Sequence, residues 1–123
     1  MPNPFVHIEL QTQDQPRAKE FYGNLFDWKL QDVPMPGGNG SYTMIDVGSG
    51  TGGGMYTQCD ASVPSSWLAY VAVEDVRAST EKARALGARI AVEVMEIGEY
   101  GWMSVFVDPT GATLALWQNK KPM

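Results

Sequence analysis

Polar and apolar side chains alternate along the segment from Phe5 to Asp14. Successive side chains of an extended strand point to opposite faces, so this alternation predicts a strand whose apolar face can pack on a helix. The apolar face carries Val6, Ile8 and Leu10, and the opposite face carries His7, Glu9 and Gln11. The polar face therefore presents the only histidine of the chain beside a carboxylate.

A helix and three strands are predicted after this first strand. Asp14 is a candidate N-cap, and the apolar positions that follow it recur at helical spacing, which predicts a helix over about residues 15–26. These apolar positions are Ala18, Phe21, Tyr22 and Leu25. The three strands are expected over about residues 28–33, 41–47 and 51–57.

The same order of elements is predicted again after a small, polar linker at about residues 58–66. Residues 67–74 have the pattern of a strand, and Asp75 is a second candidate N-cap. The following helical stripe consists of Val76, Thr80, Ala83 and Leu86, with Gly87 as a C-terminal cap. Three more strands are expected over about residues 89–97, 102–107 and 111–118.

The two halves align with each other at a spacing of 61 residues. Equivalent residues at this spacing include Asp14 and Asp75, Leu25 and Leu86, and Gly50 and Gly111. Because these are capping, stripe or turn positions, the repeat predicts two βαβββ modules, at about residues 5–57 and 67–118. The predicted fold class is therefore α+β, as a single domain over residues 1–123 in which the two sheets curve around a shared trough.

Alternation also predicts which side chains face the trough. In the second module the helix-facing side chains are Trp67, Ala69, Val71 and Val73, and the trough-facing ones are Leu68, Tyr70, Ala72 and Glu74. In the last strands, Gly54 and Tyr56 are equivalent to Ala115 and Trp117. These four positions are expected near the trough, although the glycines could instead introduce a bulge.

Composition limits the classes of partner. The 123 residues are enough for one domain with its own core, and the net charge of −5 argues against nucleic acid or an anionic membrane surface. This charge is compatible with a cationic ligand. The single cysteine, Cys59, excludes an internal disulfide, and no apolar run approaches the roughly 20 residues of a membrane span. Since no secretory leader is recognisable before Phe5, a cytoplasmic location is expected.

Three stretches resemble the vicinal oxygen chelate superfamily, which includes glyoxalase I, extradiol dioxygenases, and fosfomycin and bleomycin resistance proteins. They are HIELQTQD at residues 7–14, WLAYVAVEDV at residues 67–76 and DPTGATLALWQ at residues 108–118. The resemblance covers about residues 5–118, and the last stretch is similar to small glyoxalase-like members. It implies the paired βαβββ fold, but it does not specify a reaction, because one scaffold hosts many functions.

The resemblance also implies where a metal site would lie. In metal-dependent members, the first and last strands of each module supply the ligands, which correspond here to His7, Leu68, a residue near Gly54, and Ala115. Only His7 can bind a metal, whereas divalent ions need several protein ligands or many waters. We therefore expect no cofactor at this position. A rearranged metal site that combines His7 with Glu9 or Asp46 is the alternative.

Several side chains are candidates for a site in the trough. His7 could act as a general base or a hydrogen-bond partner of a substrate, or it could be a remnant of an ancestral ligand set. Glu9 could orient the imidazole or take a proton itself, or it could be a solvated carboxylate at the rim. The candidate ligand pocket consists of Tyr56, Leu68, Tyr70, Trp102 and Trp117. Core packing is the expected alternative for any one of Tyr56, Tyr70 and Trp117, but less so for all three together, and Trp102 could lie on a mobile lip.

Two main functions follow from these candidates. The first is a metal-free, small-molecule-binding protein, as the resemblance to bleomycin resistance proteins implies. The second is a lyase, isomerase or dioxygenase-like enzyme, either metal-free with His7 as base or metal-dependent with His7 as ligand. A third possibility is a subunit whose trough is filled by a partner. Single-chain members of this kind often form homodimers, which we also expect here.

Overall fold

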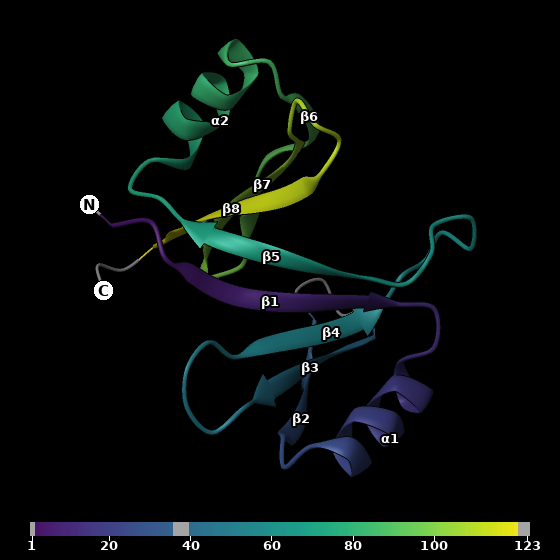
Figure 1. The fold of residues 1–123 in the computed structure, drawn as a ribbon. Helices are drawn as coiled ribbons and strands as arrows, with labels where there is room; N and C mark the ends of the chain where they lie inside the picture. Colours follow the sequence, from purple (N-terminus) through teal and green to yellow (C-terminus); the bar gives the residue numbers. More distant parts are fainter. Residues whose placement is uncertain (1, 36–39, 121–123) are drawn as a thin grey trace. The chain divides into compact units, whose positions relative to one another are not determined.

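The computed structural model describes residues 2–35 and 40–120, and it contains the predicted order of elements twice (Figure 1). The first set is β1 (Phe5–Thr12), α1 (Gln15–Leu25), β2 (Lys29–Pro34), β3 (Ser41–Asp46) and β4 (Gly53–Thr57). The second set is β5 (Ser66–Ala72), α2 (Val76–Ala85), β6 (Arg89–Ile97), β7 (Gly101–Val107) and β8 (Thr113–Asn119). The predicted α+β class with two βαβββ modules is confirmed.

The chain forms two compact units. The first unit is His7–Leu68, and the second combines the N-terminal residues up to Val6 with those from Ala69 onward. The expected trough concerns the relative placement of the two modules, and it stays a prediction. Neither α1 nor α2, the helices of the described residues, has the length and apolar character that crossing a bilayer requires.

The strands of each unit pair in one common pattern. In the first unit the strand order is β2-β3-β4-β1, where β1 and β4 are parallel and the other pairs are antiparallel. In the second unit the order is β6-β7-β8-β5, where β5 contributes its residues from Ala69 onward and is parallel to β8.

The registers of the two sheets repeat at the spacing of 61 residues that the sequence predicts. Glu9 pairs with Gly54 as Tyr70 pairs with Ala115. Between the next two strands, Thr43 pairs with Met55 as Ser104 pairs with Leu116. Equivalent residues of the two units therefore occupy equivalent places on their sheets.

Each sheet packs one face against its own helix. In the first unit Leu10, Ile45 and Met55 form the core, and Ala18 and Tyr22 of α1 pack on it. In the second unit the core consists of Val73, Val76 and Leu116, with Val71 and Phe106 packed against it. The predicted helix-facing sides of β1 and β5 are thus correct at Leu10, Val71 and Val73.

The predicted helical stripes are wrong at three positions. Phe21 and Leu25 are 58% and 55% exposed, because Ala18 and Tyr22 point to the sheet while these residues lie on the flank of α1. Leu86 is 70% exposed, because α2 ends at Ala85 and the next residue already leaves the helical path.

Several predicted boundaries also move by one or two residues. α1 ends at Leu25 rather than Phe26, whose extended φ of −124° stops the helix. β4 and β8 begin two residues later than predicted, at Gly53 and Thr113. The preceding turns contain Gly50 and Gly111, whose φ angles of 88° and 99° cannot continue a strand. β7 begins one residue early, at Gly101.

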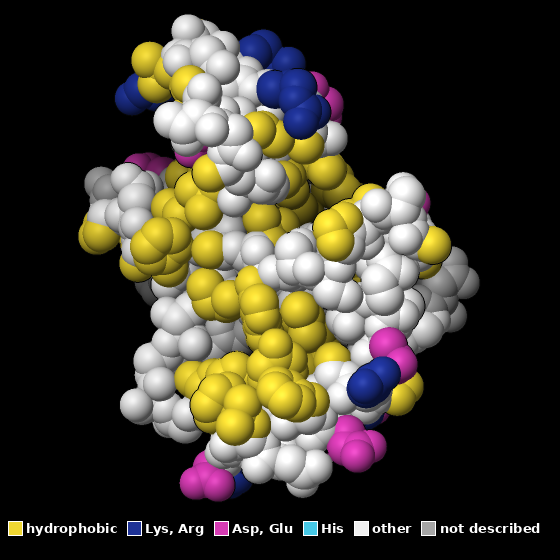
Figure 2. Space-filling model, turned by 45° about the vertical axis from the view of Figure 1, so that its right-hand side comes forward, with side chains coloured by type: hydrophobic (Ala, Val, Ile, Leu, Met, Phe, Trp, Pro, Cys, Tyr) yellow, Lys and Arg dark blue, Asp and Glu magenta, His cyan; other side chains and the backbone are white. Residues whose placement is uncertain are grey.

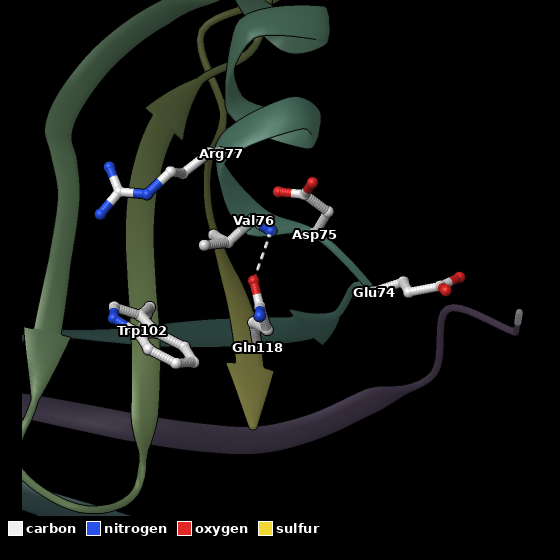
Figure 3. Close-up of a pocket in the computed structure, with 6 residues that line it drawn as sticks. All are labelled: Glu74, Asp75, Val76, Arg77, Trp102 and Gln118. Carbon is white, nitrogen blue, oxygen red and sulfur yellow. Dashed lines mark hydrogen bonds between the residues drawn. The ribbon is translucent and has the colours of Figure 1, made fainter. Parts of the chain in front are cut away.

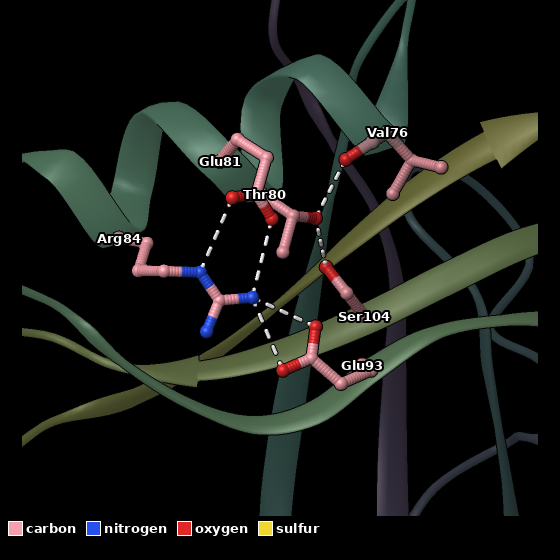
Figure 4. Close-up of polar contacts among 6 residues, drawn as sticks. All are labelled: Val76, Thr80, Glu81, Arg84, Glu93 and Ser104. Atoms are coloured by element: carbon pink, nitrogen blue, oxygen red, sulfur yellow. Dashed lines mark hydrogen bonds and ion pairs between the residues drawn. The ribbon is translucent and has the colours of Figure 1, made fainter.

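Both helices begin at the predicted caps. The side chains of Asp14 and Asp75 each accept a hydrogen bond of 3.1 Å from the backbone N–H three residues later. On α2, the Thr80 hydroxyl donates to the carbonyl of Val76 and lies 2.8 Å from the hydroxyl of Ser104 on β7 (Figure 4). These buried contacts attach α2 to its sheet, and Arg84 pairs with Glu81 and Glu93 at the solvent-exposed end.

Candidate functional site

Three polar side chains meet on the face of the first sheet that points away from α1. The phenol of Tyr42 on β3 donates to Oε2 of Glu9 at 2.8 Å, and its oxygen lies 2.7 Å from Nε2 of His7. A phenol has one proton, so when Tyr42 donates to Glu9, His7 must donate its Nε2–H to Tyr42. The three groups form a hydrogen-bonded chain, which we call the Glu9–Tyr42–His7 chain.

Tyr42 occupies the space above Gly54. A Cβ atom at position 54 would lie 2.1 Å from Cε1 and 2.2 Å from the phenol oxygen of Tyr42. Such distances are far below van der Waals contact, so the Tyr42 ring can lie here only because residue 54 has no side chain. The ring also lies stacked beside Tyr56, with centroids 6.4 Å apart.

Tyr42 is the member of the Glu9–Tyr42–His7 chain that the sequence analysis did not identify. The alternation of β1 showed that His7 and Glu9 share a face, but it contained no information about which β3 residue lies opposite them. The available signal was an aromatic residue on a neighbouring strand together with a glycine at a strand-interior position.

Burial shifts the pKa values of two side chains on this face, His7 and Tyr56. Desolvation lowers the pKa of His7 below its ordinary value of 6.5, and the nearby charge of Glu9 only partly opposes that change. Desolvation, assisted by Glu9, raises the pKa of Tyr56. The imidazole is therefore neutral at neutral pH, which allows it to accept or relay a proton.

The residues at the positions expected for a metal do not fit a divalent ion. Leu68, Gly54 and Ala115 have no donor side chain, and the Tyr42 ring fills the place of a side chain at residue 54. Within residues 2–35 and 40–120, no three or more His, Cys, Asp or Glu side chains are grouped as metal ligands would be. Asp46, the alternative partner, accepts a hydrogen bond from the Gly48 N–H in the following turn.

The corresponding face of the second unit is mostly apolar. Tyr70 and Trp117 meet edge to face with centroids 6.4 Å apart, and the Tyr70 phenol donates to the sulfur of Met103 at 4.0 Å. Tyr70 and Ala115 are buried. The structure therefore brings together Tyr70 and Trp117 of the candidate pocket, while Leu68 is a buried residue of the first unit.

Trp102 lies on the opposite, helix-facing side of its sheet. It packs against the core of Val73, Val76 and Leu116, so it does not share a face with Tyr70 and Trp117. It lines a cavity of about 420 Å³ beside the N-terminus of α2. The other lining residues are Glu74, Asp75, Val76, Arg77 and Gln118 (Figure 3).

Glu74 lines this helix-side cavity because β5 ends at Ala72, so strand alternation no longer fixes the direction of its side chain. Gln118 is held at the same cavity by the hydrogen bond that its Oε1 accepts from the Val76 N–H at 2.9 Å. The cavity thus has acidic, basic and aromatic walls.

Two βαβββ modules, each with one parallel pair of strands, are the arrangement expected for the glyoxalase-like fold. The sequence profile of the Glyoxalase/Bleomycin resistance protein/Dioxygenase superfamily matches residues 5–116. The chain therefore belongs to this superfamily, as its resemblance to known members predicted.

Individual relatives agree with this assignment. The chain is 39% identical over 117 residues to the Mycobacterium tuberculosis protein named "Putative glyoxylase CFP32", with coverage of 93% of this chain and 45% of that protein. It is 28% identical over 125 residues to the anthracycline biosynthesis protein DnrV of Streptomyces peucetius, with coverage of 91% and 46%. The chain thus spans about half the length of the curated relatives it matches.

A solved structure has the same fold. The hypothetical protein BH1468 from Bacillus halodurans superposes with a TM-score of 0.76 at 11% identity, over 100% of this chain and 99% of that one. At this identity the likeness shows the fold and no function.

Proposed function

We propose that this chain is a small-molecule-binding member of the superfamily, which binds its ligand at the Glu9–Tyr42–His7 chain without a divalent metal. The observation that carries the proposal is the position of Tyr42. Its ring fills the space above Gly54, and its phenol contacts both His7 and Glu9. A phenol thus replaces the metal as the centre of the polar group.

The residues around the Glu9–Tyr42–His7 chain suit a ligand with a planar part and a polar group. Tyr42 and Tyr56 stack side by side and are only half-buried, so they offer ring surface to a planar molecule. The polar chain can exchange hydrogen bonds with a carbonyl or hydroxyl group of such a ligand. The name of DnrV suggests anthracyclines, which contain fused planar rings, as first probes.

Isothermal titration calorimetry with a panel of anthracyclines tests this proposal. We expect Tyr42→Phe to weaken binding by up to about tenfold, since the loss of one hydrogen bond to the carbonyl or hydroxyl group of the ligand costs about 0.5–1.5 kcal/mol. Tyr100→Phe is the matched control, because Tyr100 is 67% exposed and belongs to the second unit. Binding that is unchanged in both Tyr42→Phe and His7→Gln would refute the proposed site.

A metal-free enzyme is the second candidate, favoured by the lowered pKa of His7. A neutral imidazole that is hydrogen-bonded to a phenol, with a carboxylate on the other side of that phenol, can remove a proton next to a carbonyl group, as an isomerase or lyase requires. Hydrogen–deuterium exchange into small carbonyl compounds, followed by NMR, tests this activity. If His7 is the base, His7→Gln should abolish the exchange while ligand binding persists. Exchange that continues in His7→Gln would rule out His7 as the base.

A further inference from the structure

A second cavity lies on the other face of the same sheet, on the side of α1. It has a volume of about 210 Å³ and belongs entirely to the first unit. It is lined by Ile8, Trp28, Ile45, Val47, Thr51, Gly52, Gly53 and Trp67. None of these residues carries a charge, although the whole chain has a net charge of −5. The lining therefore favours a neutral, apolar occupant over a cation or an anion.

Two tryptophans form adjacent walls of this cavity. The Trp28 and Trp67 rings are nearly perpendicular, at 80°, with centroids 6.4 Å apart. Tyr22 contacts Trp67 edge to face, with centroids 5.4 Å apart. The two tryptophan rings already contact each other edge to face, so a planar ring cannot enter between them. A planar ring that lies against them from the cavity can be parallel to one indole and edge-on to the other, which are the two favourable aromatic arrangements.

The floor of the cavity is bare backbone. At Gly53 an added Cβ would lie 1.9 Å from the carbonyl oxygen of Ile8, so the close approach of the β1 and β4 backbones requires a glycine here. The volume of about 210 Å³ is larger than the roughly 150 Å³ of an engineered apolar cavity that binds benzene, so a small aromatic ring fits this cavity by size.

Exposed apolar side chains continue from the cavity across α1. Phe21, Leu25 and Phe26 are each at least 45% exposed, and Trp67 itself is 41% exposed. Figure 2 shows hydrophobic side chains gathered at the lower part of the view, in the region of α1. The cavity is thus reachable from solvent, and its entrance can contact an apolar substituent of a bound molecule.

We infer that this Trp28–Trp67 cavity is a second small-molecule site, which binds a neutral aromatic group of one or two fused rings. The site is separate from the Glu9–Tyr42–His7 chain, because Ile8 lines the cavity while His7 and Glu9 point to the other face of β1. Its occupancy therefore does not depend on the function proposed for that chain.

Indole is a suitable neutral, bicyclic probe. We expect a titration of the ¹⁵N-labelled protein to give saturable NMR shifts at the side-chain N–H groups of Trp28 and Trp67 and at the Gly52 amide. Trp67→Ala removes one wall and should weaken the affinity about tenfold, and Val47→Phe should block binding by filling the cavity. Tyr100→Ala, which removes an exposed aromatic ring from the second unit, should leave the affinity unchanged.

Three results would overturn the inference. The first is a set of shifts that do not saturate or that spread over both units. The second is indole binding that persists in Val47→Phe, whose folding is verified by its spectrum. The third is a Trp67 signal that shifts with protein concentration in the absence of indole, because a second copy of the chain would then occupy this surface.

Discussion

In the first unit the phenol of Tyr42 donates to a carboxylate of Glu9, whereas at the equivalent positions of the second unit the phenol of Tyr70 donates to the sulfur of Met103. The strand registers at these positions are the same in both units. The difference therefore arises from side chains alone. One scaffold holds a titratable polar chain in one copy and an apolar cluster in the other, so the scaffold by itself does not determine function.

Substitutions in the helix-facing cores should have similar effects on stability in the two units. Met55 and Leu116 are equivalent, and they are 0% and 7% exposed. We expect Met55→Ala and Leu116→Ala each to lower the free energy of unfolding by about 2–5 kcal/mol, since both leave a cavity in a packed core. Urea unfolding measures the two losses. A loss below about 1 kcal/mol at either position would show that the cores are not equivalent.

Substitutions at the equivalent residues Gly54 and Ala115 should affect the stability of the two units differently. Gly54→Ala forces a Cβ into the Tyr42 ring, so we expect the unfolding free energy to fall by about 1–3 kcal/mol as the ring moves. The reverse change in the second unit, Ala115→Gly, should cost only about 0.5–1 kcal/mol, because it removes a methyl group and adds backbone freedom. Equal losses would argue that Tyr42 does not depend on the absence of a side chain at residue 54.

The smallest expected effect on the free energy of unfolding is the one that comes from protonation of His7. Because the fold lowers the pKa of His7, its contribution to stability is fully present above 6.5 and is lost as the pH falls below that value. His7→Gln should remove this part of the pH dependence. Glu9→Gln should lower the pKa of His7 further, since it removes the charge that favours the imidazolium. An NMR titration of the imidazole checks both statements, and a rise in Glu9→Gln would contradict them.

Local sequence patterns predicted the elements and the repeat, because caps and turns depend on single residues. Asp14 and Asp75 cap their helices, and Gly50 and Gly111 take the positive φ angles that the turns require. The same reasoning placed His7 and Glu9 on one face of β1.

The contents of the site depend on contacts between strands, which alternation along one strand does not determine. Tyr42 reaches Glu9 diagonally over Gly54, and this contact depends on the pairing of β3 with β4 and of β4 with β1. Trp102 pairs with Gln118, and Met103 pairs with Trp117, so Trp102 and Trp117 lie on opposite faces of the sheet. Alternation within β7 does not give this register between β7 and β8.

A titration with Zn²⁺ and Mn²⁺, followed through the His7 imidazole by NMR, tests the central claim most directly. If Tyr42 has replaced the metal at the polar centre, neither ion should give a saturable one-to-one change at His7. Stoichiometric binding that shifts the His7 signals and disappears in His7→Gln would contradict the account.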